Sequence, residues 1–187
     1  MLGTFHTMSF YGSIGYIMTN SGLQSMLELI YAEQTVPHIL SGKAFARATR
    51  AHMITTGVLN AILTANAHEI DVNFDIEDDN YFEKIHENLS KNIVFSKFAK
   101  IIVDILAKKI TSREVVALHD KIINHTLEKL KDYKEKLNEN LTAKLWFTYI
   151  DMVDIVCKLT KAQRTGNWFL HLEAVSQCIP YFASTGH

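Results

Sequence analysis

Proline is almost absent from this chain, whose 187 residues contain only Pro37 and Pro180. Proline breaks helices because it lacks the amide donor and its ring clashes with the preceding turn. Long stretches are instead rich in alanine, leucine, lysine and glutamate, which have high helix propensity. No stretch after residue 10 alternates convincingly between apolar and polar residues, as a half-buried strand would. The sequence therefore predicts an all-α protein.

Apolar spacing and capping residues indicate an irregular bundle of about seven helices. A length of 187 residues suits a single helical domain over residues 1–187. Residues 68–79 break the helical pattern with clustered carboxylates, so we expect a loop or hinge there. The last helix is expected to carry Trp168 and to stop before Pro180. The clearest helices are expected over residues 7–19, 43–67, 79–90, 95–108 and 141–161.

The longest helical pattern begins near Ser112. Four apolar residues recur there every seven positions, namely Val116, Ile123, Leu130 and Leu137. Asp120 and Lys134 stand where a second apolar row should lie, so the heptad is imperfect. We therefore expect a long helical arm between about residues 112 and 161, packed on its own chain rather than in a dimeric coiled coil. Asn140 is expected to cap the helix that follows a turn within this arm.

The formal net charge of −1 removes any argument from overall charge for binding nucleic acid or membranes. No positive residue precedes the first apolar run, and the apolar runs are too interrupted to span a bilayer. The two cysteines, Cys157 and Cys178, lie in apolar runs and are expected to be buried free thiols. We therefore expect an intracellular protein, nuclear or cytoplasmic, with no membrane partner.

Two pairs of residues are weak candidates for a metal site. Glu83 and His86 have the Glu-x-x-His spacing that di-iron bundles use twice, but the sequence contains it once. Asp151 and Asp154 lie one turn apart on an otherwise apolar helix, where Asp154 can pair with Lys158. A solvated helix face is the favoured interpretation of both pairs. We therefore expect no metal and no cofactor.

Lys43, Arg47 and Arg50 form a basic row on one face of an expected helix. Their side chains could bind phosphate groups. An ordinary solvated face is the simpler interpretation, yet this row is the strongest indication of nucleic-acid binding in the chain.

Four stretches, spread over most of the chain, resemble a group of uncharacterised animal proteins that look derived from mobile elements (transposons). They are "LGTFHTMSFYGSIG", "SGLQSMLELIYAE", "VPHILSGKAFARATRAH" and "AQRTGNWFLHLEAVSQCIPYF". The resemblance implies a longer parent chain, in which the "LGTFH" segment ends a core strand of a nuclease-like transposase domain. This chain would then be mainly the helical insertion of that domain, a fragment with a short strand or extended edge at its N-terminus.

The resemblance carries no catalytic residue onto this sequence. Such nuclease-like domains have an aspartate near that strand end and a glutamate on a later helix. Gly3 and Thr4 stand at the matching edge, and the sequence stops at His187 before any such glutamate helix. We therefore expect that this chain alone is not an enzyme.

The leading functional hypothesis is a non-catalytic helical domain of a transposon-derived protein. It would pack on a nuclease-like core, contact DNA phosphates through the basic row, or do both. Its expected partners are DNA, the rest of a longer polypeptide, or further copies in a homo-oligomer.

Two alternatives stay open. The first is a protein–protein interaction module that binds no nucleic acid and works through exposed apolar residues. These residues would be Phe5, Phe10, Tyr11, Trp168 and Tyr181. The second is a metal-dependent hydrolase that uses either Glu83 and His86 or Asp151 and Asp154.

Overall fold

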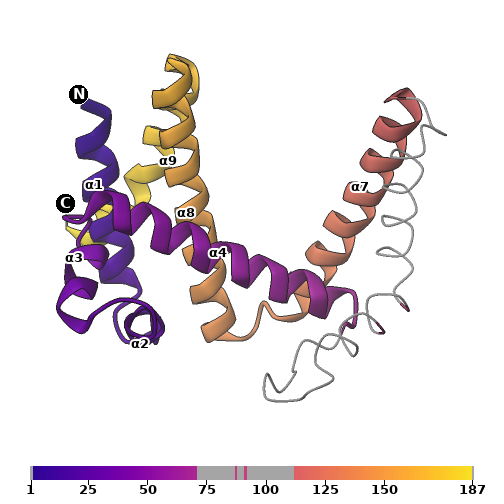
Figure 1. Cartoon of the computed structure of the whole chain (residues 1–187), viewed down its shortest axis with the longest axis horizontal. Coiled ribbons are helices and arrows are strands. Elements are labelled where there is room, and N and C mark those ends of the chain that lie inside the picture. The colour runs from indigo at the N-terminus through magenta and orange to yellow at the C-terminus, as the bar shows by residue number, and fades with distance from the viewer. Residues whose placement is uncertain (1, 71–86, 88–90, 92–111, 187) are drawn as a thin grey trace. The chain divides into compact units, whose positions relative to one another are not determined.

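The computed structural model describes residues 2–70, 87, 91 and 112–186 (Figure 1). These residues form seven α-helices, one short 3-10 helix and no strand, which confirms the all-α prediction. The α-helices are α1 (Leu2–Ile17), α2 (Leu23–Glu28), α3 (Val36–Leu40), α4 (Phe45–Ala67), α7 (Ser112–Lys136), α8 (Leu141–Thr165) and α9 (Trp168–Thr185). The 3-10 helix covers Glu33–Thr35.

The chain divides into two compact units. The first comprises residues 1–57 and 138–187, and the second comprises residues 58–137. The loop expected over residues 68–79 begins where α4 ends at Ala67, and its part from residue 71 onward lies outside the described residues. The helices expected over residues 79–90 and 95–108 also lie outside them, apart from Glu87 and Lys91, which are helical.

The N-terminus is helical, so the expectation of a short strand or extended edge there is wrong. Helix α1 starts at Leu2, before the expected start at residue 7. One glycine of this segment, Gly15, has a packing role. A Cβ on Gly15 would collide with the carbonyl oxygen of Leu40, so glycine lets α1 approach α3 closely.

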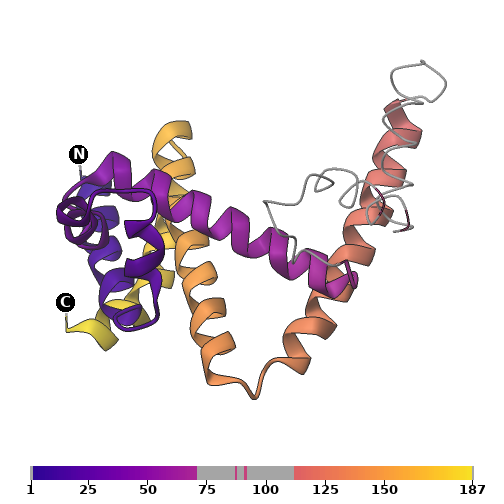
Figure 2. The same cartoon turned by 60° about the horizontal axis from the view of Figure 1, so that its bottom comes forward.

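Helices α1, α8 and α9 form the centre of the first unit. Helix α8 packs along α9, and α1 packs against both of them (Figure 2). Phe10 of α1 makes edge-to-face contacts with Tyr181 and Phe182 of α9, at ring-centroid distances of 5.7 and 5.6 Å. The largest fully buried side chains include Phe10, Tyr11, Ile14, Leu23, Leu27, Ile39, Tyr149, Met152 and Leu159.

Capping residues set the ends of α8 and α9. The Asn140 side chain accepts a hydrogen bond from the Ala143 amide at 3.1 Å, as the sequence predicted. Gly166 ends α8 in the left-handed conformation with φ 65°, and Asn167 caps α9. The break between the two long helices is therefore set by local sequence.

Helix α9 continues through Pro180 to Thr185, so the expected stop before this proline is wrong. Proline removes one helical hydrogen bond, but the next two residues, Tyr181 and Phe182, pack against Phe10. Their burial offsets the lost bond, and the helix ends instead at Gly186, where φ is 74°.

In the second unit, α7 runs unbroken for 25 residues. Its expected heptad row is only partly buried, since Leu130 and Leu137 are half-buried while Ile123 is exposed. Leu127 is exposed as well. Among the described residues, no helix is both long and apolar enough to cross a membrane.

Candidate functional site

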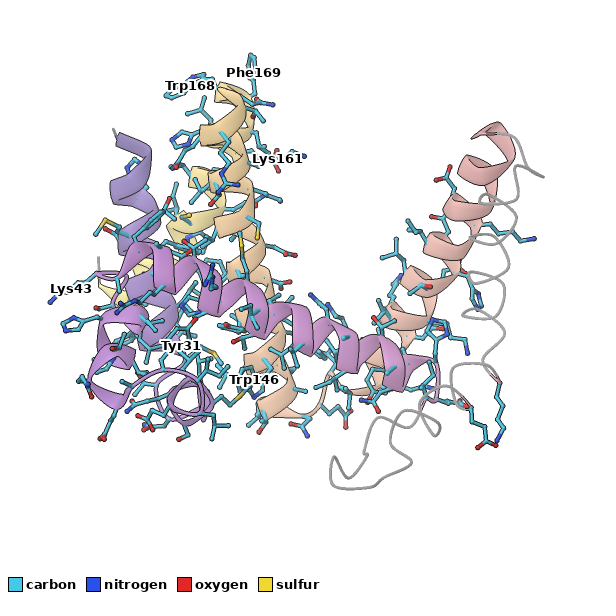
Figure 3. All side chains as sticks on the ribbon, in the orientation of Figure 1. Tyr31, Lys43, Trp146, Lys161, Trp168 and Phe169 are labelled. Atoms are coloured by element: carbon cyan, nitrogen blue, oxygen red, sulfur yellow. The ribbon has the colours of Figure 1, made fainter. Side chains whose placement is uncertain are left out.

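The basic row lies at the start of α4 on its outer side. Lys43 stands in the turn before the helix, and Arg47 and Arg50 follow in its first two turns. All three side chains are exposed, and Figure 3 shows Lys43 projecting away from the helices. Arg47 and Arg50 are three residues apart in the helix and therefore share one face, and Lys43 lies just before them, where the expected helix over residues 43–67 has not yet begun.

The charge environment of these three cations is unbalanced in the described residues. None of the three forms an ion pair within the part of the chain that the structure describes. The sequence explains this, because no aspartate or glutamate occurs between Glu33 and Glu69. The first half of α4 is therefore a locally positive surface on a chain whose net charge is close to zero.

The opposite face of α4 anchors the row to the first unit. Ala48, Ala51 and His52 are buried there. Thr49, between them, accepts a hydrogen bond from the Tyr11 hydroxyl at 2.8 Å. The basic side chains therefore extend from a backbone that is fixed by the core.

The turn before α4 is also held in place. Gly42 has φ 73°, and a Cβ on it would collide with the Met8 carbonyl oxygen of α1. The Ala44 amide donates to the His38 carbonyl at 2.9 Å. Because Ala44 has no side-chain oxygen, it cannot cap the first amides of α4. An anion bound beside Lys43 could accept hydrogen bonds from these amides.

A buried aromatic cluster joins three helices beneath the row, and sequence reasoning missed it. His52 is only 1% exposed and shares a hydrogen bond of 2.9 Å between Nδ1 and the Tyr149 hydroxyl of α8. Its ring stacks on Tyr11 of α1, with a centroid distance of 5.1 Å and an interplanar angle of 12°. His52 follows Ala48 by four residues, and this spacing could have indicated that it shares the buried face of that alanine.

Burial controls the protonation of this cluster. It lowers the pKa of His52 from 6.5 to about 4, because the charged imidazolium is poorly solvated in the core. Burial also raises the pKa of Tyr11 to about 12 and raises that of Tyr149. His52 Nε2 is buried and has no hydrogen-bond partner among the described residues. The cluster is therefore neutral at pH 7 and contributes to the core.

The acidic pair on α8 lines a shallow, open groove of about 470 Å³ between α8 and α9. Asp151 and Asp154 are both exposed. The expected pair between Asp154 and Lys158 does not form. Lys158 Nζ instead lies 3.5 Å from Glu173 Oε1 and donates to Gln177 Oε1 at 3.0 Å, which ties α8 to α9.

The described residues contain no group of three metal-binding side chains. Glu83 and His86, the other weak metal candidates, lie outside these residues. No described site therefore contains both Asp151 with Asp154 and Glu83 with His86.

A family model described as "Domain of unknown function (DUF8702)" matches residues 1–187. The chain belongs to this family. No curated protein and no solved structure matches it.

The apolar surface of this DUF8702 domain differs from the expected one. Phe10 and Tyr11 are fully buried, so the expectation that they form an exposed patch is wrong. Tyr181 is half-buried, and the side chain of Phe5 lies outside the described part of the chain. Trp168 is exposed as expected, and it projects from the start of α9 (Figure 3).

The cysteines of the domain are free thiols. Cys178 is fully buried, and burial raises its pKa to about 12. Cys157 is half-buried, and burial raises its thiol pKa as well. Neither environment favours the thiolate that a nucleophile or a metal ligand requires.

Proposed function

We propose that this chain is a non-catalytic helical domain that contacts DNA phosphates through Lys43, Arg47 and Arg50. The observation that carries the proposal is the row itself, three exposed cations at the start of α4 that form no ion pair with any carboxylate of the described residues. An unpaired cation keeps its full attraction for a phosphate, whereas a paired one must first give up its partner.

The dimensions of the row match those of a DNA backbone. Each strand of a duplex presents one phosphate for every 3.4 Å of axis, so Arg47 and Arg50, about 4.5 Å apart along the helix, can reach neighbouring phosphates, and Lys43 just before the helix can reach a third. Arg47 and Arg50 can each donate two parallel hydrogen bonds to phosphate oxygens, while Lys43 acts as a point charge. Such contacts position a protein on DNA without reading its sequence.

The fixed backbone of α4 favours such binding. The hydrogen bonds of Tyr11 with Thr49 and of His52 with Tyr149 hold the buried face of the helix. Binding would then order only the three long side chains and no part of the helix.

The resemblance to mobile-element proteins supports the choice of DNA as the nucleic acid. A transposon origin, and packing of this domain on a nuclease-like core in a longer polypeptide, belong to the same proposal. Both rest on the sequence stretches that carry the resemblance.

Charge reversal tests the proposal. The variant K43E/R47E/R50E is compared with the wild type for binding to a fluorescent 30-base-pair duplex, measured by anisotropy at low salt. We expect binding by the wild type and loss of binding by the variant. Unchanged binding by the variant would show that the row is ordinary surface.

A matched control separates the row from net charge. The variant K144E/K161E/R164E changes the charge of the chain equally, since these three cations are also exposed. We expect it to retain most of the affinity. An equal loss in both variants would contradict a localised site.

A further inference from the structure

Helix α9 exposes an apolar stripe that covers most of its length. Trp168, Leu172 and Ile179 are 64%, 48% and 60% exposed. Val175 between them is half-buried, and Ala183 at the end of the helix is exposed. Spacings of three or four residues place all five on one face. An exposed apolar face of this length is typical of an interaction surface.

The stripe is separate from the face by which α9 joins the core. Ala174 and Cys178 are fully buried, and Phe182 contacts Phe10 of α1. Helix α9 is therefore apolar on two faces, and in the first unit only one of them is covered. A surface helix needs one apolar face to pack on its own domain, so the second requires another explanation.

The charge pattern indicates what covers the stripe. Within α9 the only residue with a formal charge is Glu173, and its carboxylate lies 3.5 Å from Lys158 Nζ of α8. A charged partner would find nothing on the stripe to pair with. A second copy would bring no like charges together when the two identical faces meet.

We propose that a second copy of this chain occupies the stripe, with the two α9 helices antiparallel about a two-fold axis between Val175 and Ser176. In this register Leu172 of each copy faces Ile179 of the other. The bulky Trp168 end of one helix meets the small Ala183 end of the other, so the gap between the helices stays even. A parallel pair would crowd the two tryptophans together and leave the two alanines apart. This dimer does not depend on the proposed DNA contact.

The exposed area is enough for a weak dimer. Trp168 and the neighbouring Phe169, which is 84% exposed, offer roughly 300 Å² together, on the basis of 150–250 Å² for an aromatic side chain. Phe169 flanks the stripe, and complete burial of these two rings with Leu172 and Ile179 would remove at most about 1,000 Å² from water for two copies, near the lower limit for a specific interface. We therefore expect a dimer that dissociates in the micromolar range.

Sedimentation equilibrium of the full chain between 1 and 200 µM tests the dimer. We expect a reversible monomer–dimer equilibrium for the wild type and a monomer at all concentrations for L172K, which places a charge at the centre of the stripe. The matched control is L29K, because Leu29 is 86% exposed and follows the end of α2, away from α9 in the sequence. It should dimerise as the wild type does. Circular dichroism confirms that each variant is folded.

A mixing experiment tests the antiparallel register. In this register the lysine of L172K faces the glutamate of I179E, so an equimolar mixture should form heterodimers although neither variant dimerises alone. A wild-type chain that stays monomeric would overturn the proposal. Equal loss of dimer in L29K and L172K would also overturn it, and a mixture that stays monomeric would overturn the antiparallel register.

Discussion

Acidification should destabilise the fold through one buried histidine. His52 is 1% exposed, is stacked on Tyr11 and has its Nε2 atom buried without a hydrogen-bond partner among the described residues. Its pKa is lowered from 6.5 to about 4 by burial. As the pH falls below 6.5, the unfolded chain takes up a proton at this position before the folded chain does. The stability contribution of neutral His52 is therefore complete above pH 6.5 and is lost as the pH falls to about 4.

The magnitude follows from the two pKa values. The full difference corresponds to about 3 kcal/mol, because each pKa unit is worth about 1.4 kcal/mol. At pH 5 the unfolded chain is already protonated at His52 and the folded chain is not, so we expect a loss of about 2 kcal/mol relative to neutral pH. This loss is a large part of the stability of a typical domain.

Urea denaturation followed by circular dichroism at pH 7 and pH 5 measures the loss. The variant His52→Gln cannot take up a proton, so its stability should fall by about 2 kcal/mol less than that of the wild type over this interval. His38→Gln, which replaces an exposed ring on α3, should follow the wild type. An NMR titration of the His52 ring in the folded wild type gives its pKa directly.

Equal losses for wild type and His52→Gln would refute this reasoning. So would an NMR titration midpoint for His52 near 6.5, because the core would then accommodate the charged ring without cost.

Three further predictions concern local structure. Gly42→Ala should lower the free energy of unfolding, measured by urea denaturation, by about 2 kcal/mol or more, because alanine is strained in the left-handed conformation and its Cβ would clash with the backbone of α1. Gly22→Ala should lower it less, because Gly22 has φ 90° but open space around it, so only the backbone strain remains. Asn140→Ala should cost about 1 kcal/mol through loss of the α8 cap, and an equal melting temperature would contradict this. A thiol reagent should modify Cys157 first and Cys178 only on unfolding; immediate labelling of both would contradict the burial of Cys178.

Local signals in the sequence predicted much of the fold. The scarcity of proline predicted helices throughout, and the structure confirms them in the residues that it describes. Asn140 marked the start of α8 because a cap depends on a few adjacent residues, whereas the helix continues to Thr165, beyond the expected end at residue 161. The basic row was found in the same way, because its members follow one another at intervals of four and three residues.

Features that depend on tertiary contacts were missed. Helix α9 passes through Pro180 because Tyr181 and Phe182 are held by Phe10, which lies far away in the sequence. The partner of Lys158 is Glu173 on the next helix and not the nearer Asp154. Spacing along one helix shows which residues share a face, but it does not show which neighbouring helix supplies their partners.

The salt dependence of DNA binding tests the central claim most directly. If the row neutralises three phosphates, the logarithm of the association constant should fall with the logarithm of the salt concentration with a slope of about −3, and K43E/R47E/R50E should lose this slope with its affinity. A slope near zero for the wild type, or the same slope in the variant, would contradict the claim that these three side chains contact phosphates.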